Sequence, residues 1–246
     1  MPSALGPALF PDAPERLLDA AFSFVAECLE GGALRGYARR FAPDRARDDS
    51  PLCEAFAEGL AVFATDLARW SYAPESPAAL FAHLRVSPNL QVPFFHRITH
   101  ALYLRGTSEL PDALAMLARQ QTGMEIYYSA VIGPAMKVIH GLGTVIGAWS
   151  RVGSHFTVYQ NVTVGDKLGA RTGRDARPVL GDHVVLSAGA KVLGPVAIGA
   201  KTIVAANAVV LHSLPERCIA AGAPATVKRR GLSDAEFDVY WQSFRG

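Results

Sequence analysis

Residues 145–165 read VIGAWSRVGSHFTVYQNVTVG, and an aliphatic side chain recurs there at every sixth position. The same period returns in residues 179–210, after one spacing of sixteen residues. Ten aliphatic residues share this pattern: Ile146, Val152, Val158, Val164, Leu180, Leu186, Val192, Ile198, Val204 and Val210. The period predicts a β-helix of hexapeptide repeats, whose triangular coils need their neighbours to bury an apolar face. Strands of a β-sandwich would instead alternate with period two.

Two breaks in this period are candidate functional positions. Between Val138 and Ile146 the spacing is eight residues, and the longer turn contains His140. Residues 165–179 leave the solenoid as a loop that carries four basic and two acidic side chains. Insertions in repeat proteins map to loops on one face and often to the binding site. A solvated excursion is the alternative interpretation of the loop.

Apolar residues before position 123 follow a helical period instead. One stripe recurs every three or four residues and is expected to face a core; its members are Leu52, Phe56, Leu60, Phe63, Leu67 and Trp70. Other helices are expected over residues 12–32, 77–86, 93–105 and 110–121, with a charged loop at 42–50.

A last helix is predicted near the end of the sequence. Ser233 and Glu236 form a capping box, and an apolar stripe follows at Phe237, Tyr240, Trp241 and Phe244. The predicted fold class is α+β: a helical domain over 1–122, a β-helix over 123–229 and a C-terminal helix over 230–246.

Composition limits the possible partners. Half of the 246 residues are hydrophobic and 19% are charged, against a usual charged share of about 25%, so we expect buried subunit interface and an oligomer. The net charge of +2 gives no general field for nucleic acid or an anionic membrane. No apolar run reaches the roughly 18 residues of a membrane span, and the start lacks a basic signal region, so we expect a cytoplasmic protein.

The three cysteines are Cys28, Cys53 and Cys218. They show no metal-binding spacing, and their odd number fits a reducing compartment. We interpret them as small buried apolar residues.

Several strings between about residues 90 and 229 resemble the serine O-acetyltransferase family of hexapeptide acyltransferases. The strings are RITHALYLRG (97–106), EIYYSAVIGPAMKVIHGLGTVIG (125–147), YQNVTVG (159–165), SAGAKVLGPVAIGA (187–200) and AAGAPATVKRR (220–230). The resemblance implies a left-handed parallel β-helix, a homotrimer or hexamer, and an active site between neighbouring coils. It also implies acetyl-CoA as co-substrate, a small hydroxyl acceptor and no metal.

By this resemblance His140 matches the catalytic base, and Glu125 stands where the family has an aspartate that orients the base. A neutral imidazole, whose ordinary pKa is near 6.5, is suited to accept the proton of an attacking hydroxyl at neutral pH. A carboxylate on the other ring nitrogen fixes the tautomer and stabilises the imidazolium.

The family also suggests which residues contact coenzyme and acceptor. Small residues let the pantetheine arm approach the backbone, and they match Gly165, Ala188, Gly189 and Ala206. Lys228 and Arg229 are candidates for the nucleotide phosphates. The candidates for acceptor binding are Arg97, His100, Ile139 and Arg177.

Three departures from the family concern the acceptor. Ile139 replaces an aspartate beside the histidine, the loop reads Ala176-Arg177-Pro178 where the family has Arg-His-Pro, and Ser87-Pro88-Asn89 lacks a carboxylate. The ammonium group of an amino acid needs acidic partners in a partly dry site. The sequence therefore leaves open serine or a related hydroxyl compound, including a non-serine acceptor of a specialised pathway.

Two other classes of protein stay open. A metal-dependent β-helix hydratase would bind zinc with three histidines, but the spacings of 15 and 28 residues between His140, His155 and His183 argue against close ligands. His96 and His100 lie four apart on a helix without a third ligand nearby. A noncatalytic scaffold could also keep the solenoid.

Overall fold

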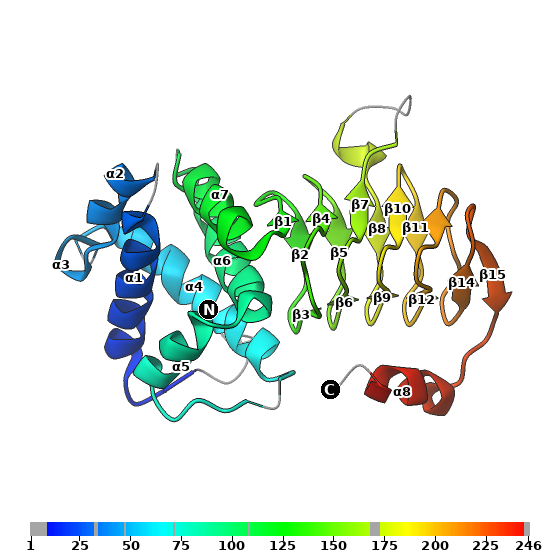
Figure 1. Ribbon diagram of the computed structural model, residues 1–246, viewed down its shortest axis with the longest axis horizontal. Coiled ribbons are helices and arrows are strands. Elements are labelled where there is room, and N and C mark those ends of the chain that lie inside the picture. Colours follow the sequence, from blue (N-terminus) through cyan, green and yellow to red (C-terminus); the bar gives the residue numbers. More distant parts are fainter. Residues whose placement is uncertain are drawn as a thin grey trace. The chain divides into compact units, whose positions relative to one another are not determined.

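The structure is a computed structural model that describes residues 9–31, 34–46, 48–70, 72–107, 109–167 and 173–243. The chain forms two compact units, Met1–Thr122 and Gly123–Gly246 (Figure 1). Gly32, Arg171 and Phe244, which contribute to the sequence predictions, lie outside the described residues. Within those described ranges, no helix is long and apolar enough to cross a membrane.

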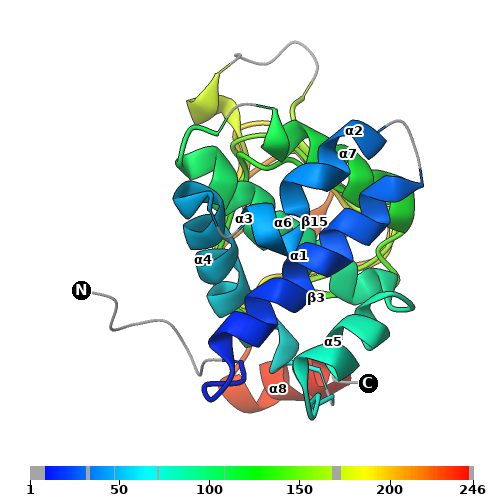
Figure 2. The ribbon, with the colours of Figure 1, turned by 90° about the vertical axis from the view of Figure 1, so that its left-hand side faces the viewer.

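The first unit is helical. Its elements are α1 (Pro14–Glu30), α2 (Arg35–Ala38), the short 3-10 helix η1 (Arg39–Phe41), α3 (Pro43–Ala46), α4 (Ser50–Leu67), α5 (Pro77–Leu84), α6 (Pro88–Leu104) and α7 (Leu110–Thr122). Figure 2 shows α1 running across this unit. Helix α6 packs against both α4 and α7, and Gly59 of α4 allows the close crossing, since a Cβ there would lie 3.0 Å from the Cα of Ile98.

Phenylalanine rings fill the centre of the helical unit. The rings of Phe24 and Phe63 each meet that of Phe94 edge to face, with centroids 5.4 and 5.7 Å apart. The predicted stripe faces this core: five of its members are buried and Trp70 is half-buried. Two helices of this unit have polar N-caps: Asp49 and Ser76 accept the N–H groups of Leu52 and Ala79 at 3.2 Å, as N-cap residues do.

Two predictions for the helical unit are wrong. The stretch at 42–50 contains α3 and is not simply a loop. Helix α6 begins at Pro88, five residues earlier than predicted, and carries Pro93 inside it. Proline is well tolerated in the first turn of a helix, and Pro93 lies beyond that turn, so the surrounding burial of α6 outweighs its unfavourable effect.

The second unit is a parallel β-helix. Its three sheets run along the solenoid: sheet A has the order β1-β4-β7-β10-β13, sheet B the order β11-β8-β5-β2, and sheet C the order β15-β14-β12-β9-β6-β3. The first coil is β1 (Glu125–Ile126), β2 (Val131–Ile132) and β3 (Lys137–Val138); the second is β4 (Val145–Ile146), β5 (Arg151–Val152) and β6 (Thr157–Val158). The third coil is β7 (Thr163–Gly165), β8 (Val179–Leu180) and β9 (Val185–Leu186), with the 3-10 helix η2 (Arg174–Ala176) in its loop.

The solenoid continues with β10 (Lys191–Leu193), β11 (Ala197–Ile198), β12 (Ile203–Val204), β13 (Val209–Val210), β14 (Ile219–Ala221) and β15 (Thr226–Arg229). The ten aliphatic residues of the six-residue period each lie on a separate strand, and none is more than 5% exposed. The hexapeptide prediction is therefore confirmed residue by residue.

The last helix, α8 (Asp234–Ser243), packs on the outer face of sheet C within the same chain. Phe237 and Trp241 contact Val185 and Ile203 there. The predicted capping box is present: the Ser233 hydroxyl accepts the Glu236 N–H at 3.2 Å, and the Glu236 carboxylate accepts the Ser233 N–H at 2.9 Å. Of the predicted stripe, Tyr240 points outward and is 36% exposed.

An ion pair is buried in the helical unit. The Arg97 guanidinium donates to both carboxylate oxygens of Asp66 at 2.8 and 2.9 Å, and the two side chains are 4% and 0% exposed. Next to it, burial and the nearby charges of Arg97 and His100 lower the pKa of His96 well below 6.5, so His96 is neutral at neutral pH.

Removing one partner of this pair should destabilise the protein strongly. We expect Arg97→Met to lower the free energy of unfolding by about 3 to 5 kcal/mol, because it leaves the Asp66 carboxylate buried without a counter-charge. The double variant Arg97→Met/Asp66→Leu should recover most of the loss. Urea unfolding of the full chain measures both, and a single variant as stable as wild type would contradict the ion pair's structural role.

Candidate functional site

The predicted catalytic residues lie where the chain passes from sheet C to sheet A. This C–A edge consists of residues 123–124, 139–144, 159–162, 187–190 and 205–208. Its corners are left-handed, with φ between 57° and 73° at Gly123, Gly143, Asn161, Gly189 and Asn207. Glycine and asparagine adopt this backbone region most easily. These residues therefore recur in the sequence at the positions where each coil turns this corner.

His140 is exposed in the one turn of this edge that is two residues longer than its neighbours. Its backbone is also left-handed, with φ 58°. Ile139 precedes it, half-buried, and its N–H donates to the Val158 carbonyl at 2.8 Å. The two extra residues therefore place His140 in an exposed turn, while the chain on either side keeps its hydrogen bonds to the neighbouring coil.

Glu125 begins β1, which pairs with β4, the strand that follows the His140 turn. Its N–H donates to the Thr144 carbonyl at 2.9 Å, and the Gly143 N–H donates to the Gly123 carbonyl at 2.9 Å. These two hydrogen bonds join the segment that contains Glu125 to the end of the turn that contains His140. One edge of the prism thus holds an acidic residue and an exposed imidazole, the two groups that a base and its orienting carboxylate require.

Three of the predicted coenzyme contacts share the same edge. Ala188 and Ala206 lie on successive coils, and the Asn207 N–H donates to the Ala188 carbonyl at 2.9 Å. Between them Gly189 has no room for a side chain, because its Cβ would collide with the Asn207 amide oxygen. A column of small residues therefore runs along the edge on the later coils.

Lys228 and Arg229 lie on β15, the strand that ends sheet C. Both side chains are exposed. They differ in their surroundings, because the Arg229 guanidinium pairs with the Glu236 carboxylate of α8.

Gly165 and Arg177 lie on a different edge, where the chain passes from sheet A to sheet B. Among the described residues, this A–B edge consists of 127–130, 147–150, 166–167, 173–178 and 194–196, with Gly165 at its border on β7. The Gly165 carbonyl accepts the Gly194 N–H at 2.9 Å, and the Arg177 guanidinium pairs with Asp166. Within one chain these residues and His140 occupy separate edges of the triangular coil.

The remaining two candidates, Arg97 and His100, belong to the helical unit. Arg97 makes a buried, bidentate ion pair with Asp66, which favours a structural role, and its predicted part in acceptor binding stays a prediction. His100 has its ring 5.7 Å from that of His96 and 6.5 Å from that of Tyr103.

One argument drawn from sequence spacing is wrong. His155 and His183 are 28 residues apart, yet their rings stack with centroids 4.5 Å apart, because the loop at 165–179 lengthens one coil without changing the register of its strands. Phe237 and Trp241 cover His183 from α8. Among the residues that the structure describes, no group of three or more His, Cys, Asp or Glu side chains is arranged to hold a metal ion.

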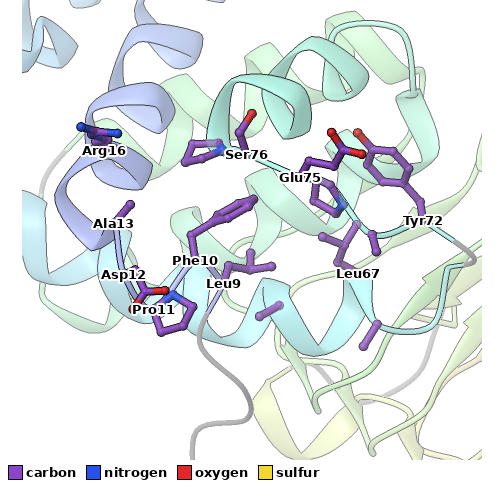
Figure 3. A pocket seen from close by; sticks show the side chains of 15 residues that line it. Leu9, Phe10, Pro11, Asp12, Ala13, Arg16, Leu67, Tyr72, Glu75 and Ser76 are labelled. Carbon is purple, nitrogen blue, oxygen red and sulfur yellow. The ribbon is translucent and has the colours of Figure 1, made fainter.

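A cavity of about 620 Å³ lies in the helical unit (Figure 3). Phe10, Leu67 and Tyr72 give it apolar walls, and Arg16 and Glu75 are among its polar lining residues. None of the sequence-predicted site residues lines it.

Sequence reasoning missed Trp149, which contacts the basic loop. The Arg174 and Arg177 guanidinium carbons lie 5.6 and 5.3 Å from the centre of its indole. Its neighbours in the sequence give no sign of this, since the contacts form only when the loop returns to the coil.

Comparison with known proteins finds relatives with one shared name, although no family model matches the chain. Serine acetyltransferase of Mycobacterium tuberculosis is 38% identical over 154 residues, which are 63% of this chain and 66% of that protein. Serine acetyltransferase of Helicobacter pylori strain J99 is 40% identical over 153 residues, which are 61% of this chain and 88% of that protein.

Solved structures agree in fold. The serine acetyltransferase of Vibrio cholerae superposes with a TM-score of 0.70 at 24% identity and covers 92% of this chain and 84% of its own. The serine acetyltransferase of Brucella abortus in complex with coenzyme A gives 0.68 at 25% identity, with 88% and 84% covered. The β-helix is thus the left-handed hexapeptide type that the resemblance implied, and with 88% of the Helicobacter protein matched at 40% identity, the chain belongs to the serine acetyltransferase family.

Proposed function

We propose that this protein moves an acetyl group from acetyl-CoA to the hydroxyl of serine or a related hydroxyl compound. The observation that carries the proposal is the C–A edge, where an exposed His140, the half-buried Glu125 and a column of small residues lie together. In a chain of the serine acetyltransferase family, this is the arrangement that acyl transfer from a thioester needs.

The chemistry follows from the residue types. Neutral His140 takes the proton of the acceptor hydroxyl as its oxygen attacks the thioester carbonyl carbon. The carbon–sulfur bond then breaks, and the imidazolium returns the proton to the leaving thiolate of coenzyme A. Glu125 orients the ring and stabilises its charged form, while the exposed turn leaves His140 accessible to both substrates.

Replacing His140 tests the base directly. We expect His140→Ala to lower acetyl transfer by about 10² to 10⁴ without unfolding the protein, because an exposed turn residue loses a proton acceptor and no core contact. Glu125→Gln should lose less, since it disturbs only orientation. Thiol release from acetyl-CoA measures both, and near-normal turnover of His140→Ala would exclude it as the base.

The acceptor site departs from the family at Ile139. We propose that free serine is a poor acceptor and that the preferred hydroxyl compound has its amine absent, masked or placed differently. A half-buried isoleucine beside the base cannot pair with an ammonium group, and one lost charge-assisted hydrogen bond costs roughly 1.5 to 3 kcal/mol, about one to two orders of magnitude in kcat/KM.

Turnover on serine, homoserine and N-acetylserine, measured side by side, tests this preference. We expect Ile139→Asp to raise kcat/KM on free serine by about tenfold or more and to lower it on N-acetylserine, since the new carboxylate pairs only with a free ammonium. Wild type that already uses serine at about 10⁴ M⁻¹s⁻¹ or above, with no gain from Ile139→Asp, would refute the proposal.

The two cations on β15 should contribute unequally to coenzyme binding. We expect Lys228→Gln to weaken coenzyme A binding about two- to fivefold, as the loss of an exposed phosphate contact does. Arg229→Gln should change less, because Glu236 already neutralises that guanidinium. Titration calorimetry at low salt measures both, and an equal loss in the two variants would contradict the distinction.

We propose further that the protein is a homotrimer or a multiple of one. Helix α8 covers the outer face of sheet C, whereas Val131 and Val179 on sheet B are 49% and 46% exposed and Val145 on sheet A is 38% exposed. Exposed aliphatic side chains on flat faces favour contact with another subunit.

Sedimentation equilibrium tests this assembly. The full chain should sediment as a trimer or a multiple of it at micromolar concentration, and Val131→Lys/Val179→Lys should weaken the assembly by placing charges on the sheet B face. A stable monomer of the wild-type chain would contradict the proposal.

A further inference from the structure

Trp149 occupies a corner that does not favour an aromatic residue. It lies between β4 and β5 on the A–B edge with φ 58°. Left-handed corners elsewhere in the coils carry glycine or asparagine and also His140, His155, His183 and Lys201, although bulky residues adopt this conformation less readily than glycine or asparagine. The tryptophan side chain, and not its backbone, is therefore the feature that needs an explanation.

The indole is the surface on which the basic loop rests as it returns to the coil. Both Arg174 and Arg177 lie over its ring, within the roughly 6 Å at which a guanidinium is attracted to an aromatic face. Arg177 is the more constrained of the two: its side chain is 14% exposed and it also pairs with Asp166. One residue further on, the Pro178 carbonyl accepts the Arg151 N–H at 3.1 Å, so the loop returns to the ladder here.

Two N–H donors of this cluster have no hydrogen-bond partner among the described residues. They are Nε1 of Trp149 and Nε of Arg177, and both atoms are buried. Buried donors are normally paired, and a donor of a charged group is especially costly to leave unpaired. The loop also has four basic residues against two acidic ones, so an anionic oxygen is the partner that its charge favours.

We propose that Trp149 is a positioning residue: its ring holds Arg177 in the orientation in which the guanidinium receives a carboxylate of an acceptor bound between two subunits of the proposed homotrimer, because Arg177 and His140 lie on separate edges of one chain's coil. This inference rests on the proposed acetyl transfer. A coenzyme phosphate would offer the same anionic oxygens. A substitution of Trp149 would then raise KM for acetyl-CoA, whereas a carboxylate ligand predicts a rise in KM for the acceptor.

The test compares Trp149→Leu, which removes the aromatic face, with Trp149→Phe, which keeps a smaller aromatic face and lacks the indole N–H. Acceptors are L-serine and N-acetyl-L-serine, each beside its primary amide. We expect Trp149→Leu to raise KM for the carboxylate acceptors about tenfold, with kcat, KM for acetyl-CoA and KM for the amides within twofold of wild type. Trp149→Phe should stay within about threefold of wild type for every acceptor.

A double-mutant cycle separates positioning from direct binding. Arg177→Gln should raise KM for the carboxylate acceptors at least as much as Trp149→Leu, and Trp149→Leu/Arg177→Gln should be no worse than Arg177→Gln alone. Arg174→Gln is the matched control, because it removes the other cation over the ring and leaves the Arg177–Asp166 pair intact. Additive losses, a rise in KM for acetyl-CoA instead, or Trp149→Phe as impaired as Trp149→Leu would each overturn the proposal.

A readout that needs no turnover keeps this test independent of the proposed reaction. Trypsin should cleave after Arg174 faster in folded Trp149→Leu than in wild type or Trp149→Phe, because Arg174 and Arg177 lose the ring that they contact. Equal cleavage rates would overturn the positioning role. A wild-type protein without turnover on any acceptor would refute the acetyl transfer, while the cleavage rates would still decide whether Trp149 holds the loop.

Discussion

The parallel hydrogen-bond ladder between successive coils is the constraint on which the rest of the second unit depends. Ile146 lies beside Val164, and Val164 beside Val192, so chain positions eighteen or twenty-eight apart occupy the same rung. Each coil buries its aliphatic residues only because a neighbour covers them. Extra residues can therefore leave the ladder only at a corner, where they do not disturb the strands.

This constraint decides where chemistry is possible. The two additional residues around His140 and the longer loop before Arg177 are both insertions at corners, on different edges of the same prism. The strand positions of the six-residue period are occupied by buried aliphatic side chains, while the two insertions carry exposed polar ones such as His140 and Arg174. The C–A edge combines an insertion with a column of small residues, and for this reason the proposed reaction has its base and its coenzyme there.

The sequence was sufficient to predict features that depend on local pattern. The six-residue period located ten strands, and the eight-residue spacing around His140 predicted a longer turn. Ser233 with Glu236 predicted the start of α8. Local signals were weaker where burial overrides them: α6 begins at Pro88 and continues through Pro93 because twelve of its seventeen residues are buried. The free cysteines were interpreted as buried, which holds for Cys218, whereas Cys28 and Cys53 are half-buried.

Features that depend on long-range contacts could not be predicted in this way. Asp66 and Arg97 come from different helices, and nothing near Arg97 in the sequence distinguishes a structural pair from a substrate contact. The spacing of His155 and His183 in the sequence argued against close contact, because the insertion between them separates two residues that lie side by side on successive coils. Trp149 contacts Arg174 and Arg177 only because the loop folds back onto the coil. The apolar stripe of α8 does not indicate on which sheet the helix packs.

The central claim is that coenzyme A lies along the C–A edge with its sulfur at His140, and disulfide trapping tests this most directly. In His140→Cys, the new thiol should exchange with oxidised coenzyme A to form a mixed disulfide and release one coenzyme A thiolate. Peptide mass mapping should locate the adduct at position 140, well above labelling of the native cysteines in wild type and of Glu216→Cys, an exposed residue near the edge between sheets B and C. Equal labelling at positions 140 and 216, or none at 140, would contradict the account.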